Sequence, residues 1–304
     1  MKEFINEIAR LKNIKDALIL AHYYQPKEIK EIADHVCDSF EMACRAREAE
    51  SSLLVICGVR FMAETAKIMN PKKCVLLPAP RAGCPMADMV TIEDITALKK
   101  QHPDAAVVCY VNSSAEVKAV SDICCTSSSA EKIVRALPEK KIIFVPDRNL
   151  GAYVASKVPE KEIILFDGYC PVHDRINEAD ALAAKKAHPK ASLLVHPECR
   201  GEVLVHADYI GSTAGIISHA IESQNSEFII GTEYGVAEHL AELAPKKKFY
   251  MLRDGFLCPD MKKIQLSDVQ FSLERGKYEI DMYSEELFDA REALERMVEL
   301  GQSE

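Results

Sequence analysis

The sequence has no tryptophan, no excess of glycine or proline, and no long apolar run. Ordinary glycine and proline contents exclude a fibrous or mainly disordered chain. The longest apolar stretches, such as residues 17–21 and 52–58, fall far short of the roughly 20 residues that a membrane-spanning helix needs. The amino-terminal residues also lack an apolar core followed by a cleavage site, so we expect no secretion signal, no membrane segment and a cytoplasmic location.

Several common functional motifs are also missing. There is no Gly-x-Gly-x-x-Gly, no P-loop and no His-Glu-x-x-His, which argues against the usual dinucleotide, nucleoside triphosphate and zinc-peptidase sites. Residues 211–215 resemble a hydrolase nucleophile elbow, but Thr213 stands where serine is expected, so a hydrolase is not predicted. The net charge of -9 argues against a nucleic-acid partner, because such binding depends on clustered Lys and Arg.

Cysteine, in contrast, is abundant. Eleven cysteines cannot all pair within one chain, and the expected cytoplasmic location keeps thiols reduced. Metal or cluster ligation therefore explains the cysteine content better than a disulfide framework does.

Short apolar runs alternate with helix-length segments along the chain. Because both faces of a parallel sheet are covered, its strands are continuous apolar runs, and this alternation predicts an α/β fold with parallel sheets. The predicted strands are residues 18–21, 53–57, 75–77, 106–109, 142–145, 163–166, 193–195, 228–230 and 249–252.

A threefold internal repeat relates these segments. The strand ends align as His22, Tyr110 and His196, with offsets of 88 and 86 residues. The same offsets relate Asp34, Asp122 and Asp208, and also Ser39, Ser127 and Thr213. Each repeat closes on a cysteine that precedes a proline, and these cysteines are Cys84, Cys170 and Cys258.

The length of the repeat predicts the domain organisation. A period near 86 residues exceeds a solenoid unit, which has about 20 to 50 residues, but suits a small doubly wound αβα domain. We predict three similar αβα domains with pseudo-threefold symmetry around a central iron-sulfur site. The predicted domains are residues 1–83 with the carboxy-terminal segment 265–304, residues 84–169 and residues 170–264. An amphipathic closing helix in that segment is expected to pack against the first domain.

Three cysteines at equivalent positions predict a shared metal site. Three thiolates can hold a 4Fe-4S cluster and leave one iron without a cysteine, and such an iron can act as a Lewis acid on a substrate. Two alternatives stay open. The cysteines could bind zinc with His173 as fourth ligand, or they could be buried structural residues.

Polar side chains stand at the predicted strand ends, where open parallel sheets bind their ligands. Tyr24, Asn112 and Glu198 follow the aligned strand ends by two residues, and alternation places residues i and i+2 on the same side. Such side chains suit proton transfer and carboxylate binding. Hydroxyls at predicted helix starts could bind an anion or simply cap the helix, and these are Ser127, Ser212 and Thr213.

The motifs of the chain resemble those of the quinolinate synthase family over nearly its whole length. They are Ala21-His22-Tyr23-Tyr24-Gln25, Phe61-Met62-Ala63-Glu64-Thr65-Ala66, Tyr110-Val111-Asn112-Ser113, Pro146-Asp147-Arg148-Asn149-Leu150-Gly151, Val195-His196-Pro197-Glu198-Cys199 and Gly211-Ser212-Thr213.

This resemblance implies condensation of iminoaspartate with dihydroxyacetone phosphate to quinolinate, phosphate and two waters in NAD biosynthesis. It implies one 4Fe-4S cluster per chain on the three repeated cysteines, and functional coupling to an aspartate-oxidising enzyme. It also implies catalytic roles for Tyr24, His196 and Glu198. The substrate-binding residues that it implies are His22, Ser39, Tyr110, Val111, Asn112, Ser127, His173, His196, Pro197, Glu198, Ser212 and Thr213.

Other functions share parts of this pattern. An iron-sulfur sensor would also leave an iron open, but the chain shows no DNA-binding or partner helix. A zinc-bound scaffold would differ in its metal, and another hydro-lyase with an open iron would not consume both substrates.

Overall fold

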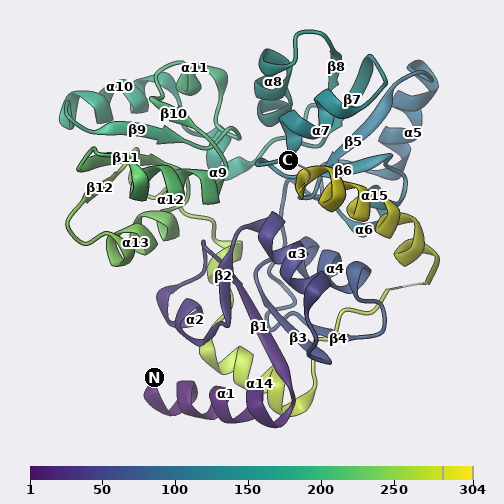
Figure 1. The fold of residues 1–304 in the computed structure, drawn as a ribbon, viewed down its shortest axis with the longest axis vertical. Coiled ribbons are helices and arrows are strands. Elements are labelled where there is room, and N and C mark those ends of the chain that lie inside the picture. Colours follow the sequence, from purple (N-terminus) through teal and green to yellow (C-terminus); the bar gives the residue numbers. More distant parts are fainter. Residues whose placement is uncertain (283, 303–304) are drawn as a thin grey trace.

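Three parallel sheets of four strands form the β structure of the chain (Figure 1). The computed structural model describes residues 1–282 and 284–302, except for the side chains of residues 284–287. In this part of the chain the strand orders are β2-β1-β3-β4, β6-β5-β7-β8 and β10-β9-β11-β12. Every pairing is parallel. Three sheets of one topology confirm the predicted α/β fold of three similar αβα domains.

The first domain is the lower lobe of Figure 1. Its helices α3 and α4 pack together over the sheet, while α1 packs on α14, which comes from the end of the chain. Its elements are α1 (Lys2–Ile14), β1 (Ala17–His22), α2 (Lys27–Ile32), β2 (His35–Cys37), α3 (Ser39–Glu48), β3 (Leu53–Cys57), α4 (Arg60–Met69), β4 (Cys74–Leu76) and α14 (Leu266–Arg275).

The second domain is the upper right lobe. Its first helix starts at a capping box in which Thr91 and Asp94 exchange hydrogen bonds. Its elements are α5 (Ile92–Gln101), β5 (Ala106–Tyr110), α6 (Ala115–Ala119), β6 (Ile123–Cys125), α7 (Ala130–Ala136), β7 (Lys141–Val145), α8 (Arg148–Lys157) and β8 (Glu162–Leu165).

The third domain is the upper left lobe. A capping box of Asn177 and Asp180 starts α10, as in the equivalent helix α5. Its elements are α9 (Pro171–Asp174), α10 (Glu178–Ala187), β9 (Ser192–Val195), α11 (Gly201–Leu204), β10 (Tyr209–Ile210), α12 (Thr213–Glu222), β11 (Glu227–Gly231), α13 (Tyr234–Leu243), β12 (Lys248–Met251) and the 3-10 helix η1 (Asp260–Lys262).

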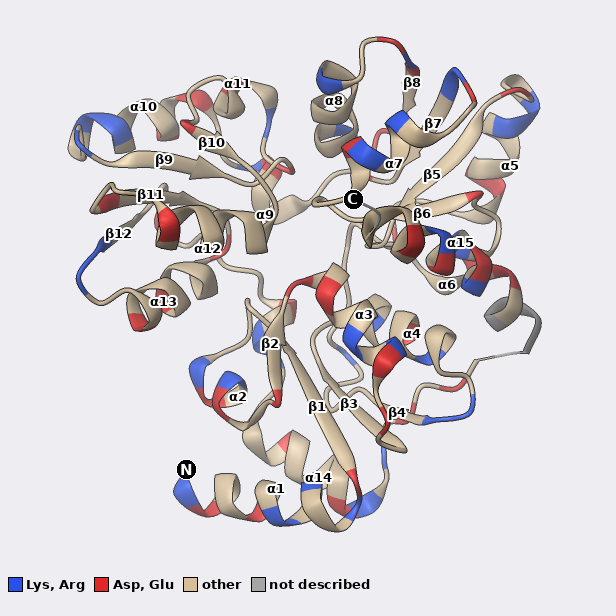
Figure 2. Cartoon of the chain, in the orientation of Figure 1, with Lys and Arg blue, Asp and Glu red and all other residues tan. Residues whose placement is uncertain are grey.

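The strands form the core of each domain. Residues of the central strands, such as Leu20 in β1, Val108 in β5 and Leu194 in β9, are fully buried. Charged residues are rare on the strands and lie mostly on helices and loops at the outside (Figure 2). Because helices cover both faces of each sheet, the apolar runs of the sequence become buried parallel strands.

The repeated aspartates are structural residues of the sheets. Asp34 accepts a hydrogen bond from the Ile19 amide at 2.8 Å, and its own amide donates to the Ile19 carbonyl at 2.9 Å. The same two bonds join Asp122 to Val107 and Asp208 to Leu193. Each aspartate also pairs with a lysine of the helix that precedes the first of the two strands, and these are Lys12 in α1, Lys99 in α5 and Lys185 in α10. The aspartate of the repeat therefore fixes the second strand against the first.

The closing helix α15 (Ser284–Gln302) joins two domains. It packs against α3 and α4 of the first domain, as the sequence predicts, and also against α6, α7 and β6 of the second domain, which the sequence does not predict. Amphipathic sequence marks the buried face of a helix but not the partner surface. The predicted domain boundaries stay predictions, and residues 283, 303 and 304 of the segment 265–304 lie outside the described residues.

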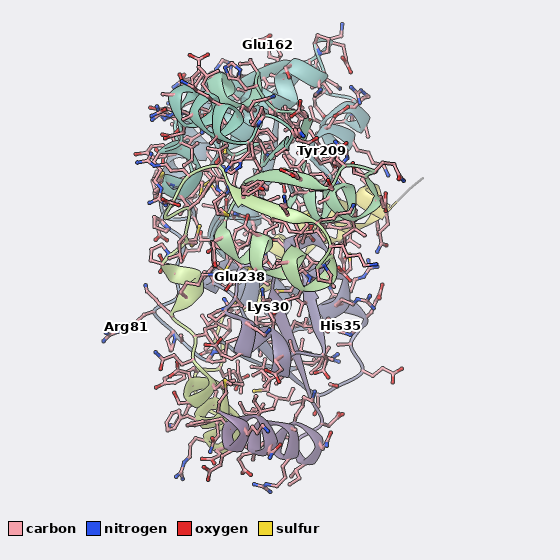
Figure 3. The ribbon with its side chains drawn as sticks, turned by 90° about the vertical axis from the view of Figure 1, so that its left-hand side faces the viewer. Lys30, His35, Arg81, Glu162, Tyr209 and Glu238 are labelled. Atoms are coloured by element: carbon pink, nitrogen blue, oxygen red, sulfur yellow. The ribbon has the colours of Figure 1, made fainter. Side chains whose placement is uncertain are left out.

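The first and third domains meet at α2 and α13. Lys30 donates from Nζ to the Gly235 carbonyl at 3.2 Å, and Figure 3 shows Lys30 next to Glu238 of α13.

None of the helices in residues 1–282 and 284–302 is long and apolar enough to cross a membrane.

Candidate active site

The carboxyl ends of the three central strands supply one cavity. His22 ends β1, Tyr110 ends β5 and His196 directly follows β9. All three line a cavity of about 150 Å³ to which the three domains contribute. The repeat therefore brings its strand ends together, as the topology of parallel sheets requires.

Most of the residues predicted from sequence line this cavity. Val111, Pro197 and Ser212 do not, and stay predictions without a cavity contact. Val111 faces a smaller apolar space beside Met42, while Ser212 caps α12 by accepting a hydrogen bond from the Gly215 amide at 3.1 Å. The predicted residues in the lining are His22, Tyr24, Ser39, Cys84, Tyr110, Asn112, Ser127, Cys170, His173, His196, Glu198, Thr213 and Cys258.

Three equivalent turns present the cysteines to the cavity. The first residue of α4, Arg60, donates its amide to the carbonyl two residues before Cys84, at 2.8 Å. The first residues of α8 and α13 do the same before the other two cysteines, at the same distance. These donors and acceptors are Arg60 with Ala82, Arg148 with Gly168, and Tyr234 with Phe256. The same main-chain hydrogen bond therefore positions the turn before each cysteine.

Backbone amides also point at the sulfur atoms. Cys84 accepts from the amides of Met86 and Ala87, and Cys170 accepts from the amide of His173. Cys258 accepts from the amides of Asp260 and Met261. Such bonds favour the thiolate and orient the sulfur, and hydrogen bonds to sulfur tune iron-sulfur sites.

The three thiols fit a metal centre and do not fit an empty polar pocket. Burial raises the pKa of Cys84 to about 12 and also raises the pKa of Cys170 and Cys258. All eleven cysteines are free, and the other eight do not line the cavity. A bound cation reverses the cost of forming buried thiolates. Three half-buried sulfurs at one cavity therefore match the donors of a cluster bound by three cysteines.

A chain of hydrogen bonds connects Tyr24 with Glu198. The Tyr24 hydroxyl lies 2.8 Å from Thr232 Oγ1, which lies 3.0 Å from His173 Nε2. His173 Nδ1 lies 2.8 Å from Glu198 Oε2, and the Tyr110 hydroxyl donates to Glu198 Oε1 at 2.7 Å. If Thr232 donates to Nε2, then Nδ1 carries the proton that Glu198 accepts. Tyr24, Thr232, His173 and Glu198 then each have a hydrogen-bond partner in this series.

The same atoms include a potential ligand set for a metal ion. Cys170, His173 and Glu198 have ligand atoms within 4.8 Å of one another. Two ligands of a tetrahedral zinc ion lie about 3.3 Å apart. The 2.8 Å between His173 and Glu198 is instead the length of a hydrogen bond, so this contact fits a shared proton better than a shared zinc ion.

Burial and hydrogen bonding give the site one base and several proton donors. Burial alone disfavours the Glu198 carboxylate, but the two neighbouring histidines and the Tyr110 hydroxyl outweigh it and lower the pKa of Glu198. Burial, together with this carboxylate, raises the pKa of Tyr24 and Tyr110 well above the usual value. Burial lowers the pKa of His22 to about 3 and the pKa of His196 to about 4. At neutral pH Glu198 is therefore a carboxylate, Tyr24 and Tyr110 are neutral phenols, and His22 and His196 are neutral imidazoles.

Neutral groups are the donors available to an anion in the cavity. No Lys or Arg is among its described lining residues. Helices α3 and α12 begin at Ser39 and Thr213, whose hydroxyl groups line the cavity, while the caps Asp38 and Ser212 already accept from amides of their first turns. Ser127 lies 3.2 Å from His196 Nε2 and adds a third hydroxyl. Carboxylate and phosphate groups can bind to such donors.

Three residues with clear roles were not predicted from the sequence. Thr232 links Tyr24 to His173, as described above. Asp147 caps α8 and accepts from the Cys170 amide at 3.2 Å, and Glu233 caps α13 and accepts from the Cys258 amide at 3.3 Å. Asp147 and Glu233 occupy equivalent places in the repeat, so the repeat itself contained the signal for them.

Fold and site together define an α/β enzyme whose three domains share a thiol-rich acid-base cavity. A family model described as "Quinolinate synthetase A protein" matches residues 6–299. The quinolinate synthase of Caldicellulosiruptor bescii is 53% identical over 296 residues, which cover 97% of this chain and 98% of that protein. Quinolinate synthase 2 of Methanosarcina acetivorans is 48% identical over 97% of this chain and 95% of its own length. The chain belongs to the quinolinate synthase A family, enzymes of NAD biosynthesis.

Proposed function

We propose that the protein condenses iminoaspartate with dihydroxyacetone phosphate to quinolinate, phosphate and two waters. The observation that carries this proposal is one cavity that combines three equivalent cysteines with the hydrogen-bonded chain from Tyr24 to Glu198. Loss of water from a substrate needs one group that takes up a proton and another that gives a proton to the leaving hydroxyl. The hydrogen-bonded chain from Tyr24 to Glu198 offers both groups inside a buried site.

The proposed cofactor is one 4Fe-4S cluster per chain, held by Cys84, Cys170 and Cys258. When bound, its iron without a cysteine supplies a Lewis acid that polarises a hydroxyl or carboxylate of the substrate. The amides that point at the three sulfurs support this assignment, because they favour the thiolate form that metal ligands need and so offset part of the effect of burial.

Neutral donors hold the acidic substrates in the proposed complex. His22, Ser39, Asn112, Ser127 and Thr213 line the cavity and can donate to carboxylate and phosphate oxygens, while Tyr110 and His173 line it with their donors directed at Glu198. The substrate phosphate binds near Ser127 or near Ser212 and Thr213, at the start of α12. Val111 and Pro197 contribute only through the main chain that carries Asn112 and Glu198.

Tyr24, His196 and Glu198 carry out the proposed proton transfers. When the Tyr24 oxygen takes a proton from the substrate, its own proton passes to Thr232, the Thr232 proton passes to His173 Nε2, and the Nδ1 proton passes to Glu198. Tyr24, Thr232 and His173 each give one proton for the one that they receive, so none of them becomes charged. The protonated Glu198 then gives its proton to a leaving hydroxyl and becomes a carboxylate again. In the loss of the second water Glu198 takes the substrate proton and Tyr24 gives a proton to the leaving hydroxyl, and this transfer in the reverse direction returns the His173 proton to Nδ1.

Two further elements of the proposal concern supply and location. Iminoaspartate is unstable, so we expect functional coupling to an enzyme that oxidises aspartate. The proposed location is the cytoplasm, and the eleven free cysteines support it because disulfides are rare in that compartment.

An assay under exclusion of oxygen tests this function. The purified protein is incubated with dihydroxyacetone phosphate, aspartate and an aspartate oxidase, and quinolinate is measured by chromatography. We expect quinolinate only when all components are present. Dehydration of a single substrate without condensation would instead indicate a different hydro-lyase, and no turnover of any substrate would favour a sensor.

A further inference from the structure

A charged residue stands four positions after each of the three cysteines that line the cavity. These residues are Asp88, Asp174 and Lys262. They differ in their surroundings, because Asp88 is exposed, whereas Asp174 is only 5% exposed and the Lys262 side chain is 19% exposed. Neither Asp174 nor Lys262 lines the cavity. Asp174 and Lys262 therefore have a role other than direct contact with a substrate in the cavity.

Asp174 is linked to the main chain of Glu198 through the side chain of Asn149. Asn149 donates from Nδ2 to Asp174 Oδ1 at 2.9 Å and to the Glu198 main-chain carbonyl at 3.1 Å. Arg148 and Arg200 also donate to the Asp174 carboxylate, at 3.2 and 3.1 Å, and fix it between the second and third domains. Asp174 directly follows His173, the residue whose Nδ1 meets Glu198. Both members of that contact are thus tied to one buried carboxylate.

Lys262 makes the corresponding contact to Tyr24. Its Nζ donates to the Tyr24 main-chain carbonyl. The ammonium group also pairs with Glu233 Oε1 at 3.0 Å, and Glu233 is fully buried and accepts from the Cys258 amide. A residue of the third domain therefore fixes the main chain of the first domain beside the cavity.

The two contacts are equivalent in the repeat. Tyr24 and Glu198 occupy the same position of the repeat, two residues past an aligned strand end. Their main chain has left the sheet and is held locally by a turn, from the Gln25 amide to the His22 carbonyl and from the Cys199 amide to the His196 carbonyl. A carbonyl that is bonded from a neighbouring domain loses the freedom to rotate its peptide group. The charged residue four positions after the remaining cysteine, Cys84, is Asp88, which is exposed and provides an internal control.

We propose that Asp174, acting through Asn149, and Lys262 are positioning residues that fix the main chain of Glu198 and Tyr24 and so align the two ends of the proton-transfer chain. This inference rests on the catalytic roles proposed above for Tyr24 and Glu198. Displacement of a reacting group by about 1 Å can cost about a hundredfold in rate. Removing either contact should therefore lower kcat and leave substrate binding largely unchanged.

The experiment uses replacements that keep shape but remove the bonding group. Asp174→Leu removes the acceptor of Asn149, and Lys262→Met removes the donor to Tyr24. Asp174→Asn keeps an acceptor oxygen and Lys262→Arg keeps a cationic donor, so both serve as conservative partners. Asp88→Leu is the matched control at the exposed equivalent position. Iron and sulfide content is measured for each variant, so that loss of a cluster is not mistaken for loss of alignment.

Two readouts separate this inference from the proposed function. Hydrogen-deuterium exchange should rise in residues 196–200 of Asp174→Leu and in residues 22–26 of Lys262→Met, and should not change in Asp88→Leu. Quinolinate formation should fall about tenfold to a hundredfold in kcat with KM changed less than about threefold, and the conservative variants should recover most of it. Unchanged exchange in both variants, or an equal rate loss in Asp88→Leu, would overturn the positioning role. Altered exchange in the two variants, together with no quinolinate formed by the wild type, would reject the proposed function and leave the positioning intact.

Discussion

Replacing Glu198 by glutamine should abolish most turnover without disturbing the site around it. Glu198 is 4% exposed and accepts two hydrogen bonds, from Tyr110 at 2.7 Å and from His173 at 2.8 Å. Glutamine has nearly the same shape, but its amide group can neither accept at both positions nor take up a proton. A general acid or base contributes about 10²- to 10⁴-fold to a rate, which corresponds to about 3 to 5 kcal/mol. We therefore expect kcat of Glu198→Gln to fall by about two to four orders of magnitude.

Steady-state quinolinate formation measures this effect, and the absorption spectrum of the metal centre checks that the site is intact. Glu162→Gln is the matched control, because Glu162 ends in solvent on β8, far from the cavity lining (Figure 3). The control should keep the wild-type rate. Glu198→Gln with more than a third of the wild-type kcat would refute the acid-base role of Glu198.

Three further changes test other parts of the account. Thr232→Val breaks the hydrogen-bonded chain between Tyr24 and His173 and should lower kcat at least tenfold. Thr232→Ser keeps the hydroxyl group and should keep most of the rate. Equal rates in the two variants would contradict a proton relay through Thr232. Asp122→Leu leaves a buried strand amide without its acceptor and should cost about 1 to 3 kcal/mol in urea unfolding while kcat is unchanged. The pKa of His196 is about 4 when folded and 6.5 when exposed, so the unfolded chain binds this proton first as the pH falls. The free energy of unfolding should therefore decrease by about 1.4 kcal/mol per unit from pH 6.5 to 4, and His196→Gln should remove this part of the slope.

The sequence predicted the convergence of the site because of a property of parallel sheets. All strands of such a sheet end at one edge, so equivalent strand ends in three domains could be expected to meet. His22, Tyr110 and His196 do so. The cysteines followed from the same argument, since each stands at a repeated position before a proline.

The remaining features depend on contacts between distant parts of the chain. Thr232 lies 208 residues from Tyr24 and 59 from His173, and nothing in the local sequence distinguishes it from a loop threonine. The repeated Asp34 is clear in the sequence, but its bonds to Ile19 show that repetition can reflect sheet structure instead of chemistry. The pattern of α15 predicted a buried face, and only the tertiary structure shows that this face bridges two domains.

The central claim is that Cys84, Cys170 and Cys258 hold one cluster, and metal analysis tests it most directly. The protein is purified without oxygen, and iron, sulfide and zinc are measured for wild type and for the alanine variant of each cysteine, with Cys57→Ala as a buried control away from the cavity. We expect about four irons and four sulfides per chain in wild type and in the control, and loss of the intact cluster in all three site variants. One zinc per chain, or metal content that does not depend on these three cysteines, would contradict it.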